Sequence, residues 1–199
     1  MTYVLINPVT DRMTDPEELE KALCAHRLQR VTCRENWTRR VLEEYSAVLQ
    51  TEKKTVLDTR CPMAVELVRA LQIDQIREAP VLPILLHCAK ELSDREDLQE
   101  GEIVVTTPCR ALAEQGNRLK LPRTVFITAR ELLDRIGYHS VKQLDRSPIP
   151  PGFFDPLGVV TVTATGGQEI TERAASLPLK TRLFEALFCP GGCHNGDGV

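Results

Sequence analysis

Short apolar, β-branched runs alternate with longer amphipathic segments along the chain. Five runs have the composition of buried strands and are bounded by polar residues, glycine or proline. They are YVLI (3–6), TVLD (55–58), EIVVTT (102–107), TVFIT (124–128) and VVTVTA (159–164). Segments with apolar residues at helical spacing lie between them, such as WTRRVLEEYSAVLQ and MAVELVRAL. Strands that alternate with helices predict an α/β fold with mainly parallel sheets.

Two helical segments carry signals for their ends. Asp15 is expected to cap the helix that follows it, with Glu18 three residues later giving a start similar to a capping box. Thr128 and Glu131 have the same spacing, and Gly137 predicts where that helix ends. The Pro-rich stretch 147–158 is interpreted as a connector between lobes.

Composition excludes several classes of protein. The chain has 199 residues, of which 42% are hydrophobic, so it can bury a substantial core. The formal net charge is −3 and no basic block occurs, which argues against nucleic-acid binding. No apolar stretch has the length of a membrane span, and the N-terminus lacks the pattern of a secretory signal. We therefore expect a cytoplasmic protein.

The seven cysteines indicate ligand chemistry rather than a disulfide scaffold, because their number is odd and the cytosol is reducing. Cys61 follows the predicted strand 55–58, and Cys109 follows the predicted strand 102–107. The carboxyl ends of parallel strands form the edge at which α/β proteins bind ligands. The C-terminal loop adds Cys189 and Cys193, so four thiolates become available.

Four thiolates suit either a 4Fe–4S cluster or zinc. The Pro-Gly-Gly between Cys189 and Cys193 allows close backbone approach, and its N–H groups can donate to sulfur. Zinc sites commonly use two C-x₂-C pairs, whereas this chain has one C-x₃-C and two solitary cysteines. The spacing favours the cluster and leaves zinc as the alternative.

The chain resembles the catalytic H-cluster domain of the iron-only (di-iron) hydrogenases, particularly divergent, sensory-type members. The similar blocks occur in the same order: DTRCP, TTPCRAL, TARELLDRIG, ATGGQE and CPGGCHNGDG. The resemblance covers roughly residues 25–199. It implies that Cys61, Cys109, Cys189 and Cys193 ligate one 4Fe–4S cluster, and that Cys193 is the thiolate that bridges to the di-iron unit in true hydrogenases.

The resemblance also implies one compact two-lobe domain over residues 1–199. We expect lobes of approximately 1–108 and 109–199, with the cluster at the interface between the lobes.

Several residues depart from the family pattern. Arg60 stands where typical enzymes have a proton-shuttling cysteine, and Leu112 stands where they have a lysine that binds a cyanide ligand. Thr107 replaces a methionine, and Ile170 occupies a position that usually holds glutamate, with Glu169 one position early. The resemblance therefore implies complete cluster ligands but a dismantled di-iron pocket.

The expected function is that of a 4Fe–4S protein in electron transfer or redox sensing within a complex, in anaerobic metabolism. A separate iron–sulfur or flavin subunit is expected as redox partner, because three remaining cysteines cannot ligate a second cubane in the usual way. These three, Cys24, Cys33 and Cys88, are interpreted as small buried hydrophobes.

Two alternatives remain open, and no catalytic residue is assigned. One is an active minimal hydrogenase, or another enzyme with an altered cluster-linked metal centre. The other is a structural or assembly protein with a Cys₄ metal site.

Overall fold

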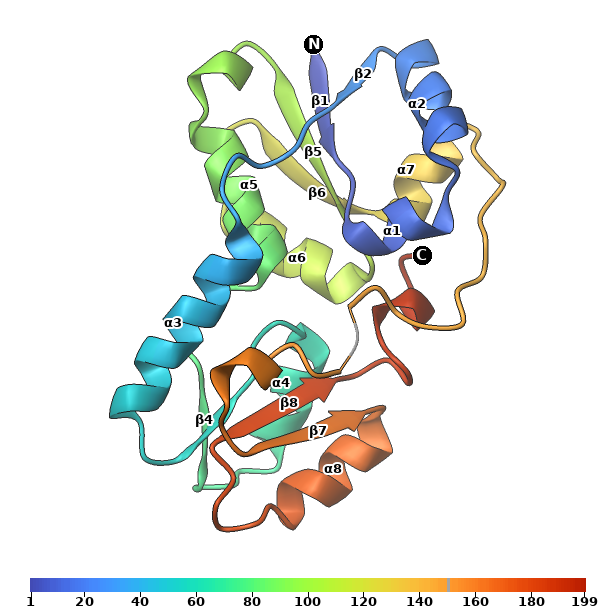
Figure 1. The fold of residues 1–199 in the computed structure, drawn as a ribbon. Coiled ribbons are helices and arrows are strands. Elements are labelled where there is room, and N and C mark those ends of the chain that lie inside the picture. Colours follow the sequence, from blue (N-terminus) through green and yellow to red (C-terminus); the bar gives the residue numbers. More distant parts are fainter. Residues whose placement is uncertain (150) are drawn as a thin grey trace. The chain divides into compact units, whose positions relative to one another are not determined.

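The computed structural model of the chain describes residues 1–149 and 151–199, which divide into two compact units (Figure 1). Unit 1 comprises Met1–Glu35, Leu85–Pro148 and Cys193–Val199, and unit 2 comprises Asn36–Ile84 and Ile149–Gly192. The lobes expected from the sequence were consecutive, approximately 1–108 and 109–199. The units instead take alternating segments, because each parallel sheet recruits strands from both halves of the chain.

Unit 1 is built on a four-stranded parallel sheet of order β2-β1-β5-β6. The strands are β1 (Thr2–Leu5), β2 (Leu28–Arg30), β5 (Glu102–Thr107) and β6 (Thr124–Thr128). The helices are α1 (Pro8–Met13), α2 (Pro16–Ala25), α5 (Ile84–Asp94), α6 (Arg110–Arg118) and α7 (Ala129–Arg135), with 3₁₀ turns η1 (Glu96–Leu98) and η3 (Cys193–Asn195).

Helices cover both faces of this sheet (Figure 1). On one face, α2 and α7 bury leucines such as Leu23 and Leu132 against Val4 and Val104 of the sheet. On the other face α6 lies so close to β6 that a Cβ at Gly116 would collide with the ring of Phe126. Strands buried on both faces explain the continuous apolar runs in the sequence.

Unit 2 repeats this architecture with a parallel sheet of order β4-β3-β8-β7. The strands are β3 (Thr55–Leu57), β4 (Ile76–Glu78), β7 (Thr161–Thr165) and β8 (Leu183–Leu187). The helices are α3 (Trp37–Thr51), α4 (Pro62–Ala70) and α8 (Gly167–Ala175), with the 3₁₀ turn η2 (Asp155–Leu157). One core joins α4 and α8 to Leu57 and Phe184, and a second joins α3 to Val56, Phe154 and Leu183.

The α/β fold with parallel sheets is confirmed, and β5 and β6 have the predicted bounds. Both predicted helix starts are also present. The Asp15 carboxylate accepts hydrogen bonds from the N–H groups of Glu17 and Glu18, and Thr128 and Glu131 form a reciprocal capping box. Gly137 follows the end of α7 with a φ of 64°, a conformation that glycine adopts without strain.

The stretch 147–158 spans the boundary at which unit 1 ends and unit 2 resumes, and its Pro150 lies outside the described residues. The stretch is more than a connector, because it also supplies the fully buried Phe154 to unit 2. Within the described part of the chain, no helix has the length and apolar character needed to cross a bilayer.

Candidate functional site

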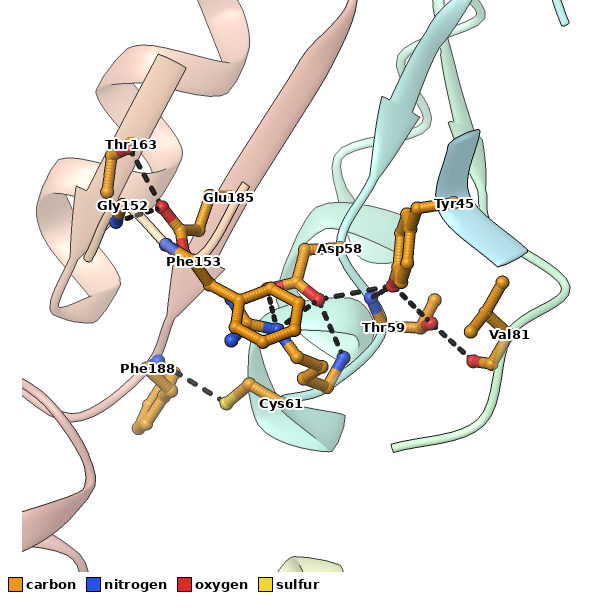
Figure 2. Close-up of polar contacts among 11 residues, drawn as sticks. Tyr45, Asp58, Thr59, Cys61, Val81, Gly152, Phe153, Thr163, Glu185 and Phe188 are labelled. Carbon is orange, nitrogen blue, oxygen red and sulfur yellow. Dashed lines mark hydrogen bonds and ion pairs between the residues drawn. The ribbon is translucent and has the colours of Figure 1, made fainter. Parts of the chain in front are cut away.

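Cys61 occupies the junction between β3 and α4 in unit 2, where it is the N-cap residue of the helix. Its sulfur accepts a hydrogen bond from the backbone N–H of Phe188, with an N–S distance of 3.4 Å (Figure 2). Burial raises the pKa of the Cys61 thiol, whereas the N–H groups of Phe188 and Ala64 act in the opposite direction. These donors would stabilise the negative charge of a ligating thiolate.

The same hydrogen bond brings the terminal loop to Cys61, because Phe188 directly precedes Cys189. The loop turns back after Cys189, where the N–H of Gly192 donates to the carbonyl oxygen of Cys189 at 3.0 Å. Gly191 and Gly192 have φ values of 74° and 119°, which side chains other than glycine rarely adopt. Unit 2 therefore holds Cys61 and Cys189 in neighbouring segments.

Cys109 occupies the equivalent junction in unit 1, between β5 and α6, and is the N-cap residue of α6. The terminal segment packs directly on this junction. The N–H of Gly198 donates to the carbonyl oxygen of Pro108 at 3.1 Å, and the N–H of Arg110 donates to the carboxylate of Asp197 at 3.0 Å. A Cβ at Gly198 would lie 2.9 Å from the backbone nitrogen of Cys109, so only glycine fits. Unit 1 thus places the segment that begins at Cys193 beside Cys109.

The four predicted ligands therefore lie on two pairs of adjoining segments, those of Cys61 and Cys189 in unit 2 and those of Cys109 and Cys193 in unit 1. All four side chains are of intermediate burial. Among the described residues, no three His, Cys, Asp or Glu side chains gather closely enough to hold a metal ion. The prediction that both Cys61 and Cys109 follow strands is confirmed, whereas joint ligation of one cluster stays a prediction.

Arg60, which directly precedes Cys61, belongs to a buried ion-pair network (Figure 2). The Arg60 guanidinium donates through Nη2 to Asp58 at 2.8 Å and to Glu185 at 2.7 Å, and both carboxylate side chains are fully buried. The guanidinium carbon also lies 4.0 Å from the ring centroid of Phe153 and 4.7 Å from that of Phe154. Two ion pairs and the contacts with two aromatic rings therefore fix the position of the Arg60 side chain.

Further donors satisfy the two carboxylates. Glu185 accepts from the N–H of Gly152 at 2.7 Å and from the Thr163 hydroxyl at 3.1 Å, while Asp58 accepts from the Tyr45 hydroxyl at 3.2 Å (Figure 2). Burial works against the charge on Arg60, but Asp58 and Glu185 outweigh it and hold the pKa of Arg60 above its ordinary range. Arg60 is thus a permanent, buried cation.

The sequence analysis identified Arg60 but missed its partners Asp58 and Glu185. A glutamate inside the apolar run LFEAL was the one available signal, since an acid buried in a strand needs a compensating charge. Two other residues that differ from the hydrogenase pattern are also buried. Leu112 is buried in unit 1, and Ile170 belongs to the core of unit 2.

No family model and no curated protein sequence matches the chain. The two parallel α/β units together have a hydrogenase-like fold, as comparison with solved structures shows. FeFe-hydrogenase HydA1 from Chlamydomonas reinhardtii is similar in two single-residue variants. One gives a TM-score of 0.60 at 12% sequence identity and the other 0.61 at 14%, each covering 99% of this chain and 79% of the hydrogenase chain. This similarity concerns the fold alone.

Proposed function

We propose that this chain is a 4Fe–4S protein of the iron-only hydrogenase family that lacks the di-iron unit and acts in electron transfer or redox sensing within a complex. The observation that carries the proposal is the combination of two pairs of adjoining cysteine segments with a buried, permanently charged Arg60 beside one of them. The first feature favours a thiolate-ligated cluster, and the second argues against hydrogen chemistry at that position.

The chemistry of the cysteine segments fits a cubane. Cys61 and Cys109 each occupy the N-cap position of a helix, where the helix dipole favours a thiolate. Only three residues separate Cys189 from Cys193, so the backbone between them spans at most about 14 Å. When bound, a cubane with four cysteine ligands supplies one-electron redox chemistry.

The environment of Arg60 does not suit a di-iron unit. A proton shuttle must exchange a proton in the working pH range, whereas a guanidinium stays charged. Its two carboxylate partners and the Phe153 ring also fill the space around it. Leu112 has no hydrogen-bond donor with which to bind a cyanide ligand, and an unpartnered polar ligand in an apolar site is costly.

The ligand assignment is tested by substitution. We expect anaerobically prepared protein to contain about four irons and four sulfides per chain, as one cubane requires. Replacing Cys61, Cys109, Cys189 or Cys193 with serine should reduce cluster occupancy, measured as iron and acid-labile sulfide. Cys24→Ser is the matched control and should leave occupancy unchanged, because Cys24 is exposed on α2. Full occupancy in a Cys189→Ser, Cys193→Ser double variant would exclude the proposed site.

Electron transfer requires a partner, and we propose a separate iron–sulfur or flavin subunit. Chemically reduced ferredoxin and a reduced flavoprotein are the two probes. Either probe should reduce the cluster on mixing, and the reduction is measured as a loss of the cluster's visible absorbance. If both fail although dithionite reduces the cluster, the electron-transfer role is wrong and a structural role for the metal site gains support. Zinc in place of iron would support that alternative directly.

A further inference from the structure

Cys33 and Cys88 belong to none of the sequence blocks that resemble hydrogenases, yet unit 1 holds their segments together and brings the two thiols close enough to interact. Cys33 lies in the segment that follows β2, and Cys88 lies in α5. Both have intermediate exposure, so small molecules can approach them. The expectation that each is simply a small buried hydrophobe is therefore incomplete, and for Cys24, which is exposed, it is wrong.

Three hydrogen bonds fix the segment around Cys33 along α5. The N–H groups of Arg34 and Glu35 donate to the Glu91 carboxylate at 2.6 and 3.3 Å. On the other side of Cys33, the Arg95 guanidinium donates to the carbonyl oxygen of Thr32 at 2.8 Å.

Cys88 shares one face of α5 with Glu91, which follows it by three positions, and Arg95 directly follows the end of this helix. The segment from β2 runs beside α5 in Figure 1 as well. Several hydrogen bonds thus hold the Cys33 segment beside α5, so the proximity of the two thiols does not depend on one flexible side chain.

The local charges distinguish the two thiols. The hydrogen bond with Cys33, together with burial and the nearby Glu91 carboxylate, raises the pKa of the Cys88 thiol. Cys88 is therefore the poorer nucleophile at neutral pH. This leaves Cys33 as the sulfur that reacts first with an oxidant, and Cys88 as the resolving thiol.

We propose that Cys33 and Cys88 form a reversible redox dithiol that is oxidised to a disulfide by small-molecule or protein disulfides. In the first step the Cys33 thiolate attacks one sulfur of the oxidant, whose S–S bond breaks and releases one thiol. Cys88 then loses its proton, attacks the Cys33 sulfur and releases the second thiol. Two protein thiols are oxidised and one external disulfide is reduced to two thiols.

A disulfide between Cys33 and Cys88 should affect the stability of the protein, because of where the two residues lie in the chain. The chain leaves unit 1 after Glu35 and returns to it at Leu85. A bond between Cys33 and Cys88 would therefore join the outgoing and returning segments, and would enclose the whole of Asn36–Ile84 in a covalent loop. Closing a long loop removes conformational freedom from the unfolded chain, so oxidation should raise the melting temperature.

Peptide mapping tests the proposal on the folded, full-length protein. The protein is equilibrated anaerobically in mixtures of reduced and oxidised glutathione, alkylated and digested with trypsin. The expected product is a disulfide between peptides 31–34 and 78–90, which carry Cys33 and Cys88. This linkage should dominate over all other cysteine pairings and should disappear on treatment with dithiothreitol. Unfolding in urea before oxidation should remove the preference, because the folded geometry creates it.

Variants separate the pair from nonspecific thiol oxidation. In Cys33→Ser, Cys88 should remain alkylatable at every glutathione ratio. In Cys88→Ser, Cys33 should stop at the mixed disulfide with glutathione. Cys24→Ser should leave the yield of the 31–34 to 78–90 linkage unchanged. The proposal is overturned if folded wild-type protein gives no such linkage under oxidising glutathione, or if its cysteines pair indiscriminately.

Discussion

At the scale of single residues, the most distinctive buried group is the Arg60 guanidinium. Asp58 and Glu185 are both fully buried and both depend on this guanidinium for charge compensation. A sequence pattern locates Arg60 and cannot locate Glu185, which lies 125 positions away and meets Arg60 only because β3 and β8 pair. The positions of Cys61 and Cys109 were easier to predict, because each depends only on the strand that precedes it.

The first prediction concerns this network. Arg60→Ala should lower the free energy of unfolding by roughly 3–5 kcal/mol, because it leaves two buried carboxylates without their cation. Urea denaturation of the anaerobic protein measures the change. Arg69→Ala is the matched control: its ion pair with Glu78 is exposed, so the expected cost is about 0–1 kcal/mol. Equal costs for the two variants would contradict the description of Arg60 as a buried structural cation.

A second prediction follows from Asp97. Its hydrogen bonds with Arg95 are the main cause that lowers the pKa of the Asp97 carboxyl from 3.8 to about 2. Since the folded pKa lies below the unfolded value, the carboxylate stabilises the fold above about pH 4 and loses this contribution as the pH falls toward 2. Asp97→Asn should therefore show a smaller loss of melting temperature between pH 4 and pH 2 than wild type. An identical pH profile would mean that this pair adds nothing to stability.

At the scale of elements, the sequence predicted best where one local rule decides the structure. The five long apolar runs became strands, and the caps at Asp15 and Thr128 formed as expected. The three strands that were missed, β2, β4 and β8, lack such a signal. Two are three residues long and carry charged or polar side chains at the sheet edge, and the third contains the buried Glu185. Their pairing is decided by tertiary structure.

The third prediction tests the α7 cap. Thr128→Ala should lower the free energy of unfolding by about 1 kcal/mol, because the N–H of Glu131 loses its acceptor and the capping box is broken. Chemical denaturation measures the difference. Thr128→Ser keeps the hydroxyl and should cost distinctly less. If the two variants are equally destabilised, the methyl group rather than the cap accounts for the effect.

At the scale of the whole molecule, two units of the same architecture share one chain whose segments alternate between them. The sequence predicted α/β structure correctly but suggested consecutive lobes, because a linear pattern does not reveal which strands become neighbours in a sheet. The similarity to FeFe-hydrogenase HydA1 covers nearly the whole chain, so the relationship concerns both units.

The fourth prediction links the proposed cluster to this architecture. If the four predicted cysteines ligate one cluster, removal of iron by anaerobic chelation should lower the melting temperature, because the metal binds the folded state alone. The Cys109→Ser variant should already melt at the lower temperature and respond little to chelation, whereas Cys24→Ser should behave as wild type. Identical melting of iron-loaded and iron-free wild-type protein would contradict ligation of a cluster by these cysteines.

The central claim is a cubane without a di-iron unit, and it is tested most directly on protein co-expressed anaerobically with hydrogenase maturation factors. Iron content and the infrared spectrum are measured on the same sample. The account predicts about four irons per chain, no bands from iron-bound carbon monoxide or cyanide, and no hydrogen evolution. Additional iron beyond the cubane together with such bands would contradict it, and hydrogen production by that sample would identify an active minimal hydrogenase instead.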